Sequence, residues 1–404
     1  MAVRVTTPLP SASAPAGSEP PPPAQLFTRQ FGLACAMHFA GGMAMSLGIL
    51  LPLFIRHLGG TEVTIGVYAG IGGAAAVLAR IPVARLLDTQ GRRRVITAAA
   101  ALEVLGWVGF TRVTHLGWAS VLLAATMGLA GGSLFASFLT YANDIVPTAR
   151  RSEGIAMFGV WGILPNGLGP ALGEFLIQRT SYTVYFLAAA GFAALALAVC
   201  RLLPETAPAL ARRAVHAAPE PVSVFPWAAI AFALGVTFVF GAAVNSLFTF
   251  LAPFAQAAGR GSVGQFFMSY SLSAVAVRVF AGRLPDRIGL QPVLVPALAS
   301  YALGLLLVPH VAAPHGLVAA GVLCGIGHGY AFPILNVLTM QRVTAAHRGR
   351  AVTWFTAMFD LGNSLANPLL GAVAHVAGYT AMFTTVGLAT LATTWVVWRR
   401  PPSR

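Results

Sequence analysis

One short polar motif occurs twice in this chain, with almost half of the chain between the copies. Each copy has an arginine, an aspartate three residues later and a glycine three residues after that. The two sets are Arg85, Asp88 and Gly91, and Arg283, Asp286 and Gly289, all offset by 198 residues. Both copies lie between long apolar segments, although charged residues make up only 9% of the chain. This pattern is typical of a membrane protein built by internal duplication.

The duplication extends beyond this motif. Arg80 and Arg278 repeat at the same offset of 198 residues. Asn166 and Asn363 repeat at 197, and a proline and a glycine follow each of them at nearby positions. Two half-molecules made of apolar segments around a charged hinge are the sequence signature of a secondary transporter.

Composition predicts an all-helical membrane protein. Apolar residues make up 57% of the chain and the mean hydropathy is +0.77. A spanning helix needs about 20 apolar residues, and lipid offers the backbone no other hydrogen-bond partners. A β-barrel would require alternation of apolar and polar residues, which residues 98–109 do not show. Twelve spans are predicted at 31–55, 62–84, 94–112, 117–140, 154–176, 182–203, 226–250, 262–284, 291–309, 315–338, 351–374 and 379–398.

These spans form two pseudo-symmetric six-helix bundles, predicted over 29–203 and 226–399. Between them, residues 204–225 contain several prolines and two arginines and form a cytosolic linker. Residues 1–28, rich in proline, alanine and serine, are predicted to be a disordered cytosolic tail. Residues 400–404 form a second short cytosolic tail.

The charge distribution predicts the orientation in the membrane. The net charge of +14 would suggest nucleic acid as a partner of a soluble protein, but here its placement follows the spans. With the amino terminus inside, 19 of the 25 cationic residues, all of them arginine, fall in cytoplasmic segments and four fall outside. The positive-inside rule therefore places both termini in the cytoplasm. Arg80 and Arg278 lie just within helix ends, and are predicted to snorkel to the cytosolic face. Arginine without lysine suggests a GC-rich bacterial genome, and hence the bacterial inner membrane.

The first copy of the motif resembles the loop motif between helices 2 and 3 of the major facilitator superfamily, Gly-x-Leu-Ala-Asp-Arg-x-Gly-Arg-Arg. Residues 84–93 match it at Leu86, Asp88, Gly91, Arg92 and Arg93, and the resemblance covers roughly residues 30–400. It implies a latch that holds the cytosolic gate shut in one of two alternating states. The alternative is a structural turn that carries positive-inside charge.

The residue types of the motif suit such a latch. Gly91 and Gly289 permit a tight turn between successive helices. Asp88 and Asp286 are expected to accept hydrogen bonds from the N-terminus of a neighbouring helix, where the helix dipole favours an anion.

The fifth span resembles the glycine- and proline-rich helix of drug/proton antiporters in this superfamily, at Gly169, Pro170 and Gly173. Close packing of helices alone also explains such residues. The family's helix-4 motif contains an arginine linked to proton coupling. Residues 124–132 contain none, so this chain departs from the usual scheme.

Two carboxylic acids lie deep within predicted spans and are candidates for proton coupling, because ionisable groups are costly there. Asp360 lies about ten residues into the eleventh span, with Arg350 as its nearest charge in sequence. Glu103 lies in the third span, where a role in packing is the alternative. Polar groups that could line a substrate cavity, or simply satisfy the core, are His38, Tyr141, Asn166, Asn245, His328, Tyr330 and Asn363.

Nothing in the sequence indicates catalysis, a metal site or a cofactor. No nucleophile has an accompanying base, no phosphate loop is present, and the three cysteines lie far apart in apolar spans. The favoured function is export of a small amphipathic organic compound in exchange for protons, by a monomer in the lipid bilayer. The alternatives are uptake of a metabolite by the same fold, and a membrane sensor that does not transport.

Overall fold

The computed structural model describes residues 25–147, 150–206, 225–259, 261–311, 315–344 and 347–400. Most residues of the two predicted tails, 1–28 and 400–404, and of the predicted linker, 204–225, lie outside the described residues. The described part is helical and contains no strand, as predicted from composition.

The helices of the first half are α1 (Arg29–Leu47), η1 (Gly48–Leu50), α2 (Leu51–His57), α3 (Glu62–Gln90), α4 (Arg92–Phe110), α5 (Trp118–Ile145), α6 (Arg151–Arg179) and α7 (Tyr182–Leu202). Those of the second half are α9 (Trp227–Ala258), α10 (Val263–Phe280), α11 (Leu284–Ile288), α12 (Leu290–Leu307), η3 (Val308–His310), α13 (Gly316–Met340) and α14 (Arg348–Arg399). Each predicted span lies on one or more of these helices.

Local sequence explains where several helices begin. The side chain of Thr28 accepts a hydrogen bond from the backbone N–H of Phe31, which caps α1. Thr61 and Thr64 cap each other's backbone at the start of α3. Gly91 and Gly289 precede α4 and α12 with nearly the same backbone angles, φ 99° and 98° and ψ 159° and 160°. A residue with a Cβ atom rarely adopts a positive φ, so the duplicated turn depends on glycine.

Ten helices in the described residues are long and apolar enough to cross a membrane. One of them, Arg350–Arg399, contains 50 residues. At 1.5 Å per residue it would measure about 75 Å, more than twice the thickness of the hydrocarbon core. Gly378 (φ 83°, ψ 165°) interrupts it, between the two spans predicted there. The count of twelve spans remains a prediction.

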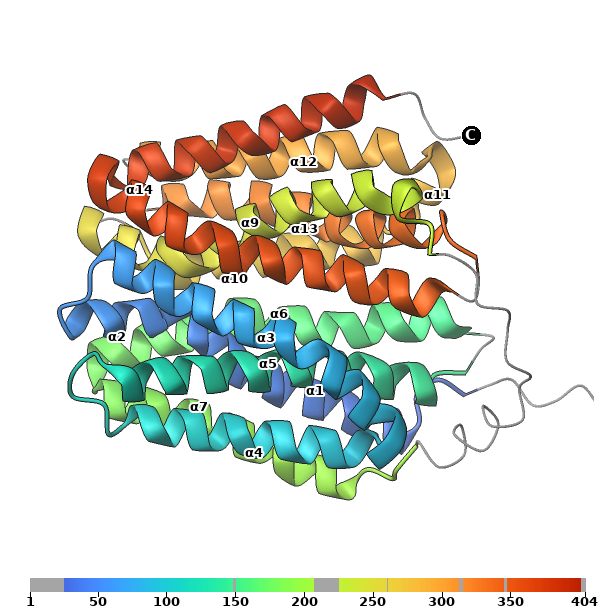
Figure 1. Ribbon diagram of the computed structural model, residues 1–404, viewed down its shortest axis with the longest axis horizontal. Helices are drawn as coiled ribbons and strands as arrows, with labels where there is room; N and C mark the ends of the chain where they lie inside the picture. The colour runs from blue at the N-terminus through green and yellow to red at the C-terminus, as the bar shows by residue number, and fades with distance from the viewer. Residues whose placement is uncertain are drawn as a thin grey trace, which may run out of the picture.

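The helices form two groups, α1–α7 and α9–α14, which lie side by side (Figure 1). Between the groups, α3 packs extensively against α14 and α6 against α10. We call the end of the molecule that carries Asp88 and Asp286 the motif end, and the end that carries Arg56 and Glu62 the far end.

Candidate functional site

Glycines on one face of α3 bring it close to α14 in the other half. A Cβ atom on Gly70 would lie 2.7 Å from Cγ of Pro368 and 2.9 Å from the carbonyl oxygen of Ser364. One on Gly73 would lie 3.3 Å from Cα of Ser364. Small residues allow such close approach of spanning helices. Any side chain at Gly70 must therefore push the two halves apart.

We expect Gly70→Ala to destabilise this conformation by about 1–3 kcal/mol, the usual cost of overpacking. Gly191→Ala on α7 is the matched control, because a Cβ atom there would meet nothing within 4 Å. That control should be neutral or stabilising by up to about 1 kcal/mol, since alanine favours helix over glycine. The apparent melting temperature in detergent measures both. Equal shifts for the two variants would contradict the close contact at Gly70.

An ion pair crosses the same interface nearer the motif end. Nε of Arg80 on α3 donates to Oδ2 of Asp360 on α14 at 3.0 Å, and Nη2 of Arg80 contacts the same oxygen. The two side chains are only 10% and 22% exposed. The prediction that Arg80 snorkels to the cytosolic face is therefore wrong: a carboxylate 280 residues away in sequence compensates its charge inside the protein.

The duplicate of Arg80 has no such partner. Nε of Arg278 on α10 is buried and has no hydrogen-bond partner among the described residues. Its guanidinium group lies against the first half, with Nη1 3.6 Å from where a Cβ atom on Gly159 would be. The position that corresponds to Asp360, 197 residues earlier, is Ile163, which cannot pair with a cation. Both halves thus contain the arginine, but in the described residues a carboxylate neutralises only the one in the first half, Arg80.

At the far end, a polar network joins the halves. Arg56 pairs with Glu62 at 3.4 Å, and its Nη1 donates to the hydroxyl of Tyr379 at 3.1 Å and to the carbonyl of Pro253 at 3.2 Å. Glu62 also accepts from the Tyr379 hydroxyl at 3.1 Å and lies 3.3 Å from Nδ1 of His375. The halves are therefore closed at this end.

A second far-end contact joins α6 to α10. Oε2 of Glu174 accepts hydrogen bonds from the hydroxyl of Ser262 at 2.5 Å and from the backbone N–H of Gly264 at 2.9 Å. Sequence reasoning did not identify these far-end residues. A signal existed, because Glu62 and Glu174 are rare acids at helix ends in a chain with few charges, but their partners in the other half could not be found without the fold.

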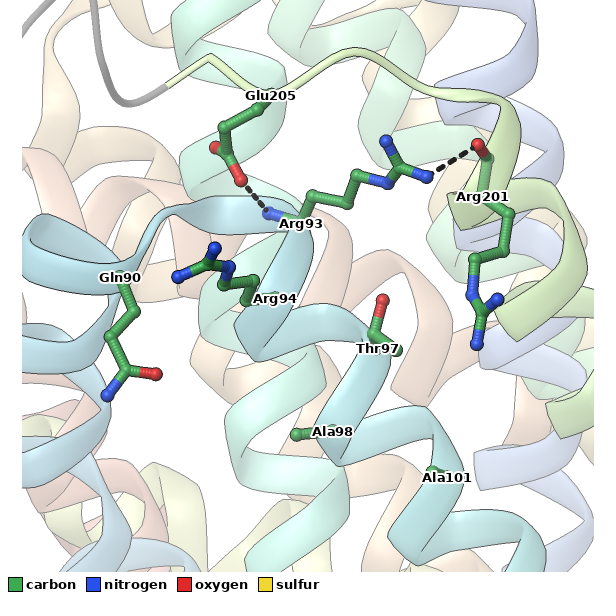
Figure 2. A pocket seen from close by; sticks show the side chains of 8 residues that line it. All are labelled: Gln90, Arg93, Arg94, Thr97, Ala98, Ala101, Arg201 and Glu205. Carbon is green, nitrogen blue, oxygen red and sulfur yellow. Dashed lines mark hydrogen bonds between the residues drawn. The ribbon is translucent and has the colours of Figure 1, made fainter.

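At the motif end, the carboxylate that caps a helix is not the one expected. Glu205, just after α7, accepts hydrogen bonds from the backbone N–H groups of Arg92 at 2.8 Å and Arg93 at 3.0 Å, the first two residues of α4. Figure 2 shows the bond to Arg93. The predicted acceptor, Asp88, instead lies 3.3 Å from Nη1 of Arg92, and its side chain is 76% exposed. The expectation for Asp88 is therefore wrong, because Asp88 still belongs to the last turns of α3.

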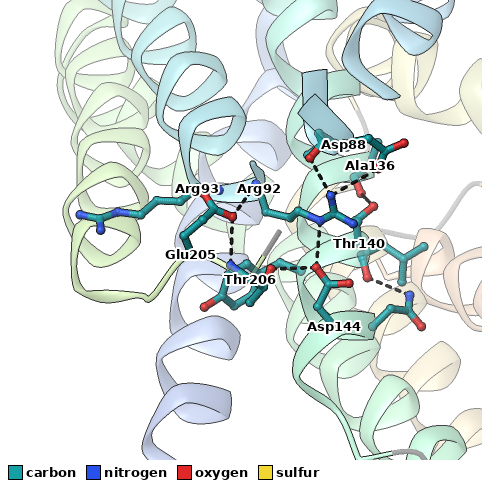
Figure 3. A network of polar contacts seen from close by, with 12 residues as sticks. Asp88, Arg92, Arg93, Ala136, Thr140, Asp144, Glu205 and Thr206 are labelled. Atoms are coloured by element: carbon teal, nitrogen blue, oxygen red, sulfur yellow. Dashed lines mark hydrogen bonds and ion pairs between the residues drawn. The ribbon is translucent and has the colours of Figure 1, made fainter. Parts of the chain in front are cut away.

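The side chain of Arg92, on α4, contacts groups on two other helices of the first half, α3 and α5 (Figure 3). Its Nε donates to Asp144 on α5 at 2.9 Å, and its Nη1 donates to the carbonyl of Leu87 at 2.6 Å. The hydroxyl of Thr206 donates to the same Asp144 oxygen at 2.7 Å. These contacts bind α3, α4 and α5 to each other at the motif end.

The second copy of the motif is more open. Arg283, which precedes the short helix α11, and Asp286 within it are exposed, and no contact of Asp286 corresponds to the Asp88–Arg92 pair in the described part of the chain. The latch role of both copies stays a prediction.

The helix-5 motif lies on α6 and packs mainly within its own half. A Cβ atom on Gly173 would lie 2.8 Å from Cδ1 of Leu50, and one on Gly169 would overlap Ser46. Pro170 is buried in the same segment. Gly167 instead faces the other half, where a Cβ atom on it would lie 3.1 Å from Cα of Met268 on α10. This helix thus holds α1 on one side and α10 on the other.

The cavity candidates are not brought together. The ring of His38 stacks on Phe158 and its Nδ1 lies 3.2 Å from the Phe158 carbonyl. The His328 ring contacts the hydroxyl of Tyr270. Tyr141 donates to the carbonyl of Pro204, Asn245 to that of Gly241 and Tyr330 to that of Ala281. Each of these contacts joins two residues of the same half.

Two candidate asparagines occupy the surfaces of α6 and α14 at half-buried positions, Asn166 and Asn363. Asn363 accepts a hydrogen bond from Asn367, which also donates to Thr249 at 2.9 Å. Glu103 is 1% exposed on α4, and its Oε2 has no hydrogen-bond partner among the described residues. Of the two coupling candidates, only Asp360 lies at the interface between the halves.

Comparison with known proteins identifies the family. The sequence profile of the Major Facilitator Superfamily matches residues 33–277 and again residues 233–404. The chain belongs to this superfamily. Two overlapping matches to one profile agree with the duplicated motifs. Members of this transporter superfamily move small molecules across membranes by a fold of spanning helices.

The curated relatives of this superfamily member include drug-resistance proteins. It is 28% identical over 368 residues to the Multidrug resistance protein MdtG of Klebsiella pneumoniae, covering 85% of this chain and 87% of the relative. It is 24% identical over 364 residues to the Multi-drug resistance efflux pump PmrA of Streptococcus pneumoniae, covering 86% and 89%. Among solved structures, a POT family transporter in complex with 5-aminolevulinic acid has a TM-score of 0.76 at 14% identity, covering 92% of this chain and 95% of the other.

Proposed function

We propose that this protein exports small amphipathic organic compounds in exchange for protons, by alternating access. The observation that carries the proposal is the Arg80–Asp360 ion pair, which joins the two halves through otherwise apolar spanning helices. Ionisable groups at such positions are costly and mark ion pathways.

The ion pair suits antiport because it links the charge of Asp360 to the change of conformation. An antiporter must change conformation when it carries either the proton or the substrate, and must not change when it carries neither. With Asp360 ionised, separating α3 from α14 would leave two charges unpaired, which is strongly unfavourable. A proton on Asp360 removes that penalty, and the contacts of a substrate bound elsewhere between the two halves offset it. Symport would require the empty carrier to move freely, so the pair favours export over proton-driven uptake.

Several observations support the membrane and the substrate class in this proposal. The arginine distribution supports a cytoplasmic position for the motif end and both termini, and the bacterial relatives support the inner membrane. The relatives are named for drug resistance and efflux. Arg278 is one cation without an ionic partner in the described interface, which is too little positive charge to favour a polyanion. We infer that the protein acts as a monomer.

Transport of a fluorescent amphipathic dye into inverted membrane vesicles tests the proposal. Acidifying the vesicle lumen should drive dye accumulation in vesicles with the protein, and an uncoupler should abolish it. Accumulation that requires the opposite gradient would favour uptake instead. No movement under either gradient, with the protein present in the membrane, would favour a sensor.

The Asp88→Asn variant tests whether the first copy of the motif is a latch or a structural turn. Among the described residues the Asp88 side chain pairs with Arg92 alone, and it is largely exposed, so the variant should fold and reach the membrane. We expect at least a tenfold loss of dye flux if Asp88 serves a latch in the alternate conformation, equal to about 1.4 kcal/mol. Asp286→Asn tests the second copy in the same assay. Unchanged flux in both variants would leave the motif a structural turn.

A further inference from the structure

A basic cavity lies on the outer flank of the first half, away from the interface between the halves. It has a volume of about 720 Å³ and lies where α4 and α7 end at the motif end. Figure 2 shows the guanidinium groups of Arg94 and Arg201 reaching it from the two helices, with Arg93 between them. Three arginines therefore surround one cavity.

The positive charge of this cavity is only partly compensated by the described residues around it. Arg93 is held in place, because its Nη2 donates to the carbonyl of Arg201 at 2.9 Å. Glu205 is the one acid among the described lining residues, and it accepts from backbone N–H groups of α4. Arg94 and Arg201 have exposed side chains, with no hydrogen bond or ion pair of those side chains to other described residues. The cavity thus presents two guanidinium groups that are free to bind an anion.

An apolar strip leads away from the cavity along α4. Ala98 is exposed in the cavity wall. About two and three helical turns further on, Leu105 and Val108 are 64% and 42% exposed. Leu202 on α7, beside the cavity, is 63% exposed. In a spanning protein such side chains face acyl chains, so a ligand here would meet positive charge at one end and an apolar surface at the other.

We propose that this cavity binds the phosphate group of an anionic phospholipid. Basic pockets between spanning helices at the cytoplasmic side suit lipid head groups. The guanidinium groups of Arg94 and Arg201 bind the phosphate oxygens, the Thr97 hydroxyl lies in the same wall, and the acyl chains follow the strip from Ala98 to Val108. Arg93 in the first turn of α4 and Glu205, which caps that turn, both line the cavity, so the lipid lies directly beside the first copy of the motif.

Native mass spectrometry of the purified protein tests this site with two probe lipids, phosphatidylglycerol and phosphatidylcholine. The protein should retain phosphatidylglycerol preferentially. The double variant Arg94→Gln with Arg201→Gln should lose about 30-fold in that preference, since each arginine near a membrane surface contributes about fivefold. Arg287→Gln, an exposed arginine beside the second copy of the motif, is the matched control and should keep the preference.

A further variant keeps both arginines but fills the cavity with a larger side chain. Ala98→Trp should weaken phosphatidylglycerol binding while both arginines remain. Melting temperatures in phosphatidylcholine report whether each variant is folded. A double variant that is folded and still prefers phosphatidylglycerol would overturn the proposal. Equal stabilisation by inorganic phosphate and by the anionic lipid would also overturn it, because the site would then bind free anions.

Discussion

Asp360→Asn is expected to abolish proton-driven transport while sparing substrate binding and counterflow. The amide has the shape of a protonated carboxyl group but cannot release a proton. It also removes the charge that holds α14 to Arg80, so the empty carrier is free to change conformation. In vesicles with an imposed pH gradient, dye accumulation should fall to background, whereas exchange of labelled for unlabelled dye should continue.

Glu103→Gln is the matched control for this variant. Glu103 is also a carboxyl group within a span, but it lies on α4, which packs against α5 and α7 in its own half. The control should keep its response to the pH gradient. Proton-driven accumulation like that of the wild type in Asp360→Asn would contradict the assignment and move attention to Glu103. Loss of both dye binding and expression in Asp360→Asn would instead indicate a structural hydrogen-bond role for Asp360.

The fold could be predicted because each of its determinants is local in sequence. A run of about 20 apolar residues must become a helix in lipid, whatever its neighbours are. The turns at Gly91 and Gly289 require a positive φ, which the sequence marks with glycine. The helix that continues through the two last predicted spans shows the limit of such reasoning, since only the backbone at Gly378 divides it.

The pairing of charges could not be predicted, because it depends on which helices pack together. Asp360 was recognised as unusual, but its partner Arg80 lies in the other half and was assigned to the membrane surface. The same problem affected Asp88, since Glu205, more than 100 residues away from Arg92, takes the position at the start of α4. Rarity in sequence identifies a costly group, whereas only the fold identifies what compensates it.

The substrate cavity is the least predictable part of the site. Side chains such as His38 and Tyr141 were selected because they are polar groups within spans. In the structure both contact backbone carbonyl groups of their own half, and the Tyr141 hydroxyl also accepts from the side chain of Gln30. A polar group in a core needs a partner whether or not a ligand binds, so polarity alone does not separate the two roles.

We expect the same substitution to have very different effects on stability at the two duplicated arginines, Arg80 and Arg278. Arg80→Gln leaves Asp360 buried without its cation and should destabilise the protein by about 3 kcal/mol, as loss of one partner of a buried pair does. Arg278→Gln removes a cation that has no ionic partner among the described residues, so it should be neutral or stabilising. Melting temperatures in detergent compare the two variants directly.

A double variant isolates the pair itself. If Arg80→Gln is harmful because it strands a carboxylate, adding Asp360→Asn should recover most of the lost stability, since two neutral amides replace two charges. The recovered protein should still lack proton-driven transport, because restored packing does not restore a titratable group. Equal destabilisation by Arg80→Gln and Arg278→Gln, without rescue by Asp360→Asn, would mean that both arginines act through packing of their side chains. The asymmetry between the two halves would then have no part in coupling.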